Sequence, residues 1–255
     1  MLPSLSSLEA LDVAYARFNA VRSLRPHDPE LRVTENEGMT VLHDPSRPQD
    51  ETYNRVVGLT QAHLPLLAEV LTSFGEVTAQ VDVPVDRMTP EVCDALSEHR
   101  LRPVQSVVWL WADPAAMDHA QVEGVSVRRL EGEAGLLLDL IGSISTPIGD
   151  EVRAQRAGFY CTQTFRAYLA SVDSEPAGWA TLWVDRGVGI LGNADTLPEF
   201  RRRGVQSALY RARARDAATL ELPWVVTDVA PETSSHRNAL RAGMQRRTTN
   251  VWWRQ

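Results

Sequence analysis

The sequence predicts a protein of the α+β class, built from strands and helices. Three observations carry this prediction. Short segments with alternating apolar residues occur in both halves of the chain, and segments with apolar residues at helical spacing lie between them. Residues 188–220 also read as a strand, a glycine-containing turn and a helix. The 255 residues are enough for one large domain or two small ones.

Residues 1–115 form the first predicted domain. Its helices are expected at residues 7–23, 63–74 and 90–99, and its strands at 31–33, 39–42, 53–59, 76–83 and 104–112. Ser7 and Thr89 precede apolar periodic segments, as N-cap residues do. Pro65 fits the first turn of the second helix, because that position needs no backbone N–H.

After a linker at residues 115–122, the second predicted domain covers residues 122–255. Its strands are expected at 125–130, 164–172, 177–184, 188–197, 224–229 and 248–253, and its helices at 136–143, 205–220 and 234–242. Residues 146–149 break the first of these helices, and 150–158 are helical or irregular. Pro198 cannot donate to a sheet ladder and therefore ends the strand before it.

The basic residues exclude some functions. All 26 of them are arginine, which excludes a lysine P-loop and a Schiff-base mechanism. Residues 1–123 hold 9 arginines and 19 acidic residues, whereas residues 124–255 hold 17 arginines and 14 acidic residues. The second half therefore suits an anionic cofactor, and the acidic first half suits either a cationic substrate or simple solubility. With a pI near 5.4, the chain is not expected to bind nucleic acid.

The sequence gives no sign of a membrane or secreted protein. No apolar run approaches the roughly 20 residues of a membrane helix, and the first residues lack the pattern of a signal peptide. Cys93 and Cys161 lie in different halves and are expected to be reduced thiols in the cytoplasm. No metal site is predicted.

An anion site is predicted where residues 196–207 turn from strand into helix. The first turn of a helix presents unpaired N–H groups and the positive end of the peptide dipole. Arg201, Arg202 and Arg203 add charge, and Gly204 lets a phosphate approach the backbone. The alternative is an ordinary strand-to-helix turn with a solvated basic cluster.

This turn resembles motif A of the GNAT (Gcn5-related) N-acetyltransferases, which reads Arg/Gln-x-x-Gly-x-Gly/Ala. Arg201-x-x-Gly204-x-Gln206 matches the first two fixed positions and departs at Gln206. Thirty residues later, Ser-Ser-His-Arg-Asn-Ala-Leu-Arg-Ala-Gly-Met at 234–244 resembles the closing helix of the family. The resemblance covers residues 122–255. Residues 1–115 follow the GNAT order only in outline and lack the Arg-x-x-Gly turn, so they are expected to be a degenerate GNAT-like half or an unrelated α/β cap.

The resemblance implies a mixed, mostly antiparallel sheet with flanking helices in an α/β/α arrangement. It also implies acetyl-CoA as cosubstrate. By position, Ala194 and Thr196 would contact its acetyl carbonyl and pantetheine arm, and backbone N–H groups of residues 202–207 would hold its pyrophosphate. The expected cofactor-binding residues are Ala194, Thr196, Leu197, Arg201, Arg202, Arg203, Gly204, Val205, Gln206, Ser207 and Asn238.

The acid and base of many GNAT enzymes are missing from their usual positions. The carboxylate expected on the motif strand is replaced by Ile190, and the tyrosine of the closing helix by Ala239. Asp195, Ser235 and Tyr160 are the candidate substitutes. Each also has a structural explanation, which is turn formation for Asp195, helix capping for Ser235 and core packing for Tyr160. Strand alternation also turns Asp195 away from the site.

The function expected from the resemblance is transfer of an acetyl group from acetyl-CoA to a primary amine of a small molecule or peptide by direct attack. Because the usual acid and base are absent, a non-catalytic acyl-CoA sensor or interaction protein is the alternative. No Gly-x-Gly-x-x-Gly follows a strand, so a dinucleotide enzyme is not favoured. The sequence leaves monomer and homodimer open.

Overall fold

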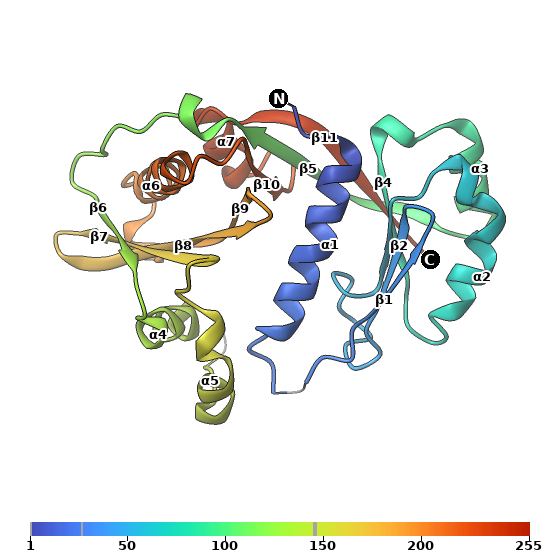
Figure 1. The fold of residues 1–255 in the computed structure, drawn as a ribbon, viewed down its shortest axis with the longest axis horizontal. Helices are drawn as coiled ribbons and strands as arrows, with labels where there is room; N and C mark the ends of the chain where they lie inside the picture. The colour runs from blue at the N-terminus through green and yellow to red at the C-terminus, as the bar shows by residue number, and fades with distance from the viewer. Residues whose placement is uncertain (1, 27, 145–146) are drawn as a thin grey trace. The chain divides into compact units, whose positions relative to one another are not determined.

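A computed structural model describes residues 2–26, 28–144 and 147–255 (Figure 1). The chain forms two compact units. The N-terminal unit contains Pro3–Val108 together with Thr248–Gln255, and the C-terminal unit contains Trp109–Arg247. Strands β5 (Arg102–Ala112) and β11 (Gln245–Arg254) contribute residues to both units. The last strand of the chain thus belongs largely with the first half, unlike the proposed division into 1–115 and 122–255.

The N-terminal unit contains a mixed sheet with the strand order β1-β2-β3-β4-β11. Its elements are α1 (Leu5–Val21), β1 (Arg32–Asn36), β2 (Met39–His43), β3 (Arg55–Val57), η1 (Gln61–Leu66), α2 (Leu67–Ser73), β4 (Gln80–Pro84), η2 (Val85–Arg87) and α3 (Pro90–Glu98). Strands β3 and β4 are parallel, whereas β1–β2, β2–β3 and β4–β11 are antiparallel.

Some element ends in this unit differ from those expected. The N-cap of α1 is Ser4, whose hydroxyl accepts a hydrogen bond from Ser7 N–H, so Ser7 lies inside the helix. The segment at 61–73 begins as a 3₁₀-helix that contains Pro65 and continues as α2. Strand β4 starts at Gln80 rather than at residue 76, because residues 74–77 form a turn and a bend around Gly75, whose φ is 59°.

At the turn between β3 and the following helix, the His63 side chain contacts backbone groups of the same unit. His63 Nδ1 accepts from Thr60 N–H at 3.1 Å, and its Nε2 lies 3.3 Å from Glu37 O. In the same unit the Arg55 guanidinium binds the Asp82 carboxylate at 2.8 Å, and both side chains are buried. The Thr60–His63 hydrogen bond gives this helix start a partner within its own unit.

The C-terminal unit contains a mixed sheet with the strand order β10-β9-β8-β7-β6. Its elements are η3 (Pro114–Ala116), β6 (Ser126–Leu130), α4 (Ala134–Ile144), α5 (Asp150–Arg156), η4 (Ala157–Phe159), β7 (Phe165–Val172), β8 (Glu175–Asp185), β9 (Val188–Thr196), η5 (Pro198–Phe200), α6 (Val205–Thr219), β10 (Val225–Val229) and α7 (Ser234–Arg241). Strands β9 and β10 are parallel, and the other pairs are antiparallel. The break expected at 146–149 begins on residues outside the described ranges.

Helix α6 packs on one face of this sheet, and α4 lies on the opposite face (Figure 1). The residues Val205, Leu209, Ala214 and Ala217 are buried on α6, which packs against the strands. Burial of such an aliphatic side chain contributes about 1.5–3 kcal/mol for valine or leucine. Helices therefore flank a mixed sheet, which confirms the predicted α+β class.

Cys93 and Cys161 are free thiols, as expected, and burial raises the pKa of the Cys161 thiol to about 11. Among the residues that the structure describes, none of the helices combines the length and the apolar character that crossing a membrane requires.

Candidate cofactor and active site

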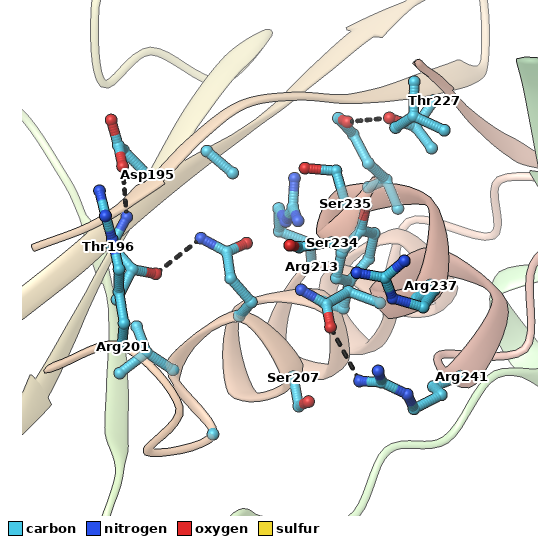
Figure 2. Close-up of a pocket in the computed structure, with 18 of the residues that line it drawn as sticks. Asp195, Thr196, Arg201, Ser207, Arg213, Thr227, Ser234, Ser235, Arg237 and Arg241 are labelled. Carbon is cyan, nitrogen blue, oxygen red and sulfur yellow. Dashed lines mark hydrogen bonds between the residues drawn. The ribbon is translucent and has the colours of Figure 1, made fainter. Parts of the chain in front are cut away.

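A cavity of about 740 Å³ opens in the C-terminal unit where two parallel strands part (Figure 2). Strands β9 and β10 pair only at Val225↔Gly189 and Val226↔Ile190. One residue later, the Thr227 hydroxyl donates to Leu191 O at 2.8 Å. The cavity lies between β9, β10, α6 and α7. It is lined by residues 191–196, Phe200, Arg201, Arg202, residues 204–207, Tyr210, Arg213, residues 227–229, Ser234, Ser235, Arg237, Asn238 and Arg241.

The strand β9 wall of the cavity carries a β-bulge. The pairing with β8 shifts between Thr181↔Gly192 and Trp179↔Asp195, so β9 has one extra residue there. Asn193 within the bulge has a φ of 42°, in the left-handed region. Gly178 on β8 permits the close approach of β9, because a Cβ at this position would lie 2.5 Å from Asp195 O.

The start of α6 forms the mouth of the cavity. Arg202 and Gly204 have φ values of 65° and 82°, which reverse the chain into the helix. The first intrahelical hydrogen bond runs from Ala208 N–H to Gly204 O at 3.0 Å. The N–H groups of residues 205–207 precede it, and no side chain caps this N-terminus among the described residues. Such a terminus binds anions.

The charge of the cavity also favours an anion. Among the described lining residues, five are arginines and two, Asp195 and Asp228, are acidic. The arginines are Arg201, Arg202, Arg213, Arg237 and Arg241. Figure 2 shows Thr196 and Arg201 on one side of the cavity and Ser235 and Arg237 on the other.

Most residues predicted for the site lie together in this cavity. They are Ala194, Asp195, Thr196, Arg201, Arg202, Gly204, Val205, Gln206, Ser207, Ser235 and Asn238. Leu197, Arg203 and Tyr160 lie outside its lining. Leu197 N–H donates to Ala177 O at 3.0 Å, and Arg203 binds the Asp173 carboxylate at 2.8 Å. Tyr160 is buried with its ring edge-on to Phe165, which is the core-packing alternative.

Two side chains of the chain itself hold Thr196 (Figure 2). Its backbone N–H donates to Asp195 Oδ1 at 2.7 Å, and its hydroxyl accepts from Gln206 Nε2 at 2.8 Å. Simple strand alternation turns Asp195 away from the site, yet this residue lines the cavity, because the bulge before it interrupts the alternation. The Gln206 side chain spans from α6 to the end of β9.

Sequence reasoning missed a second layer of site residues on α6 and β10. They are Tyr210, Arg213, Thr227 and Asp228. Arg213 is fully buried and donates to Thr181 O and Leu209 O, each at 3.1 Å. Its guanidinium carbon lies 4.7 Å from the centre of the Tyr210 ring. Residues 206, 210 and 213 are spaced as one helix face, and this spacing was the signal that could have identified Tyr210 and Arg213.

Ile190 and Ala239 occupy the positions where the resemblance places a base and an acid. Ile190 is 1% exposed and Ala239 is fully buried, and both side chains belong to the hydrophobic core. Neither residue is part of the cavity lining among the described residues. The structure thus places no side-chain acid or base at these two positions.

Comparison with known proteins identifies the fold. No protein-family model and no curated protein matches the chain. Among solved structures, a GCN5-related N-acetyltransferase from Kribbella flavida is 15% identical, with a TM-score of 0.66 over 96% of this chain and 94% of that chain. A GCN5-related N-acetyltransferase from Sphaerobacter thermophilus is 14% identical, with a TM-score of 0.61 over 100% and 94% of the two chains.

A tandem GNAT protein from the clavulanic acid biosynthesis pathway is similar over the whole chain as well. It is 14% identical, with a TM-score of 0.59 over 100% of this chain and 97% of that chain. At such identities, the similarity establishes the fold and not the reaction. The chain therefore has the fold of the GNAT acetyltransferases, which is the superfamily that its sequence resembles.

Proposed function

We propose that this chain transfers an acetyl group from acetyl-CoA to a primary amine of a small molecule or peptide. The observation that carries the proposal is the position of the cavity. It opens where β9 and β10 part, and its mouth is the uncapped start of α6. One cavity thus has helix N–H groups for an anion at its mouth and the backbone of β9 along its wall.

The residues present fit a diphosphate ester. The N–H groups at 205–207 supply helix-terminal donors, and Arg201 and Arg202 supply positive charge. Gly204 keeps the turn compact, because its φ is 82° and an added Cβ would lie 2.8 Å from Val122 Cγ1. Ala194 and Thr196 on β9 would hold the pantetheine arm. When bound, acetyl-CoA supplies an activated thioester.

The chain's own groups can accelerate the transfer in two ways. Backbone N–H donors on the cavity wall can stabilise the negative charge that develops on the carbonyl oxygen. Holding both reactants in one cavity removes much of the entropic cost of their encounter. The carboxylates of Asp195 and Asp228 are the acidic groups of the described lining and can attract a cationic amine.

A non-catalytic acyl-CoA sensor is the second candidate function. Burial of Ile190 and Ala239 in the core favours it, because both are apolar where the resemblance expects a base and an acid. A sensor would bind the cosubstrate in the same cavity but would not release free thiol.

Two measurements on the wild-type chain test the proposal. Acetyl-CoA at 100 times its Kd should stabilise the fold by about 2.7 kcal/mol, which raises the melting temperature by roughly 5–10 °C. Release of free coenzyme A is then measured with a panel of amino acids, polyamines, aminoglycosides and peptides. No melting shift at millimolar acetyl-CoA contradicts both candidate functions, whereas a shift without thiol release from any amine favours the sensor.

A further inference from the structure

The proposed transfer needs a proton donor, and this inference rests on that proposed function. The amine loses a proton as it attacks, and the sulfur that leaves must gain one. The position that the resemblance gives to the donor holds Ala239, whose side chain is fully buried in the core. Another proton-bearing group must therefore reach the inner part of the cavity.

Tyr210 has the chemistry of such a donor. The hydroxyl groups of the described cavity lining belong to Thr196, Ser207, Tyr210, Thr227, Ser234 and Ser235. Among these, a phenol is the hydroxyl that ionises in the accessible pH range, with an ordinary pKa near 10. It can therefore give up its proton and recover it within a catalytic cycle.

The direction of α6 places Tyr210 away from the anion site. At its first turn, Gln206 contacts Thr196 at the end of β9. Two turns later, Arg213 contacts Thr181, which pairs with Gly192 of β9. The helix thus runs back along β9, and Tyr210 lies between these two contacts.

The phenol reaches the point where the strands part. The Tyr210 side chain is 5% exposed, and its hydroxyl interacts with Thr227. The Thr227 hydroxyl in turn donates a hydrogen bond to Leu191 O, one residue beyond the paired residues of β9 and β10. A ligand held by its diphosphate at residues 204–207 and extended along β9 therefore directs its other end towards this hydroxyl.

Burial and two neighbouring charged groups together set the pKa of the phenol. The charged groups are Arg213 from α6 and Asp228 from β10. Burial raises the pKa of Tyr210, so the phenol carries its proton at neutral pH. The buried Arg213 guanidinium, 4.7 Å from the ring centre, opposes that shift and stabilises the phenolate left after proton transfer.

We propose that Tyr210 is the catalytic residue that protonates the leaving sulfur. The amine nitrogen forms a bond to the carbonyl carbon, and the C–S bond breaks with its electron pair on sulfur. Tyr210 gives its phenol proton to that sulfur. The amine nitrogen releases one proton to water, and the Tyr210 phenolate recovers one from water, so the site returns to its starting state.

Tyr210→Phe keeps the ring against Arg213 and removes only the hydroxyl. In the thiol-release assay, kcat should fall by about 100-fold or more, while the KM for acetyl-CoA stays within about twofold. Tyr53→Phe is the matched control, because it removes the hydroxyl of another buried tyrosine, a residue that is 7% exposed and lies in the N-terminal unit. This control should leave kcat unchanged. Wild-type kcat in Tyr210→Phe would overturn the proposal.

A spectroscopic titration tests, without turnover, whether the Tyr210 hydroxyl lies beside the sulfur of coenzyme A. The ultraviolet absorbance of phenolate is titrated in wild type and Tyr210→Phe, and their difference isolates Tyr210 among the five tyrosines. Coenzyme A should shift this titration, and desulfo-coenzyme A, which lacks the sulfur, should shift it less. Equal effects of the two probes, or no effect while coenzyme A binds, contradict the proposed role of Tyr210 but leave the proposed function intact. If coenzyme A does not bind to wild type, the proposed function fails as well.

Discussion

Gly204→Asp should lower the affinity for coenzyme A by about 100-fold or more. The backbone at this position has a φ of 82°, and an added Cβ would lie 2.8 Å from Val122 Cγ1. The new carboxylate would also stand at the helix start that is proposed to hold the diphosphate. Like charges in contact cost several kcal/mol, and each 1.4 kcal/mol is a factor of ten in Kd. Isothermal titration calorimetry with coenzyme A measures the change.

Gln206→Ala is the matched control for this substitution. Gln206 lies two residues further along the same turn, and any residue there still offers its backbone N–H. The variant loses only the side-chain hydrogen bond to Thr196. It should bind coenzyme A within about tenfold of wild type. Wild-type affinity in Gly204→Asp, measured beside this control, would contradict an anion site at the start of α6.

Asp216→Asn should destabilise the C-terminal unit by about 3 kcal/mol. Asp216 on α6 binds Arg166 of β7 at 2.7 Å and accepts a hydrogen bond from the Tyr168 hydroxyl. Arg166 is 7% exposed, so loss of the carboxylate leaves a buried cation without its counter-charge. Burial and the Asp216 carboxylate together raise the pKa of Tyr168, which keeps this phenol protonated as a donor. Urea unfolding followed by circular dichroism gives the free-energy change.

Asp173→Asn provides the comparison for Asp216→Asn. Asp173 pairs with Arg203 at 2.8 Å, but both side chains are exposed. Its backbone has a φ of 52°, which asparagine tolerates as well as aspartate does. An exposed pair contributes about 0–1 kcal/mol, so this variant should unfold close to wild type. Equal stabilities of the two variants would mean that the buried contacts of Asp216 do not hold α6 on the sheet.

The order of elements in the C-terminal unit was predictable because its signals are local. Apolar alternation, helical spacing, Pro198 after a strand and Gly204 before a helix each act over a few residues. The structure confirms a strand, a turn and a helix at β9, 197–204 and α6. The same local pattern led to most residues of the cavity mouth.

The inner part of the cavity depends on contacts between distant segments. Thr227 meets Leu191 only because β10 lies beside β9, and the role proposed for Tyr210 depends on α6 running back along β9. The position of Asp195 depends on a β-bulge that pairing with β8 defines. Alternation within one strand cannot predict such a shift in register.

The N-terminal unit shows a second limit of sequence reasoning. The segment at 76–79 alternates as a strand does, but after Gly75 it forms a turn, a bend and irregular backbone. Strand β11 belongs in part to the N-terminal unit, although it follows the C-terminal elements directly in the sequence. Both outcomes depend on which segments pair in the fold, and pairing over long sequence separations leaves no local signal.

A crystal structure of the chain grown with coenzyme A tests the central claim most directly. The expected result is a diphosphate within hydrogen-bond distance of the N–H groups at 205–207, with the pantetheine arm along β9. An empty cavity, with Asp195 and Gln206 still holding Thr196, or coenzyme A bound elsewhere on the chain, would contradict it.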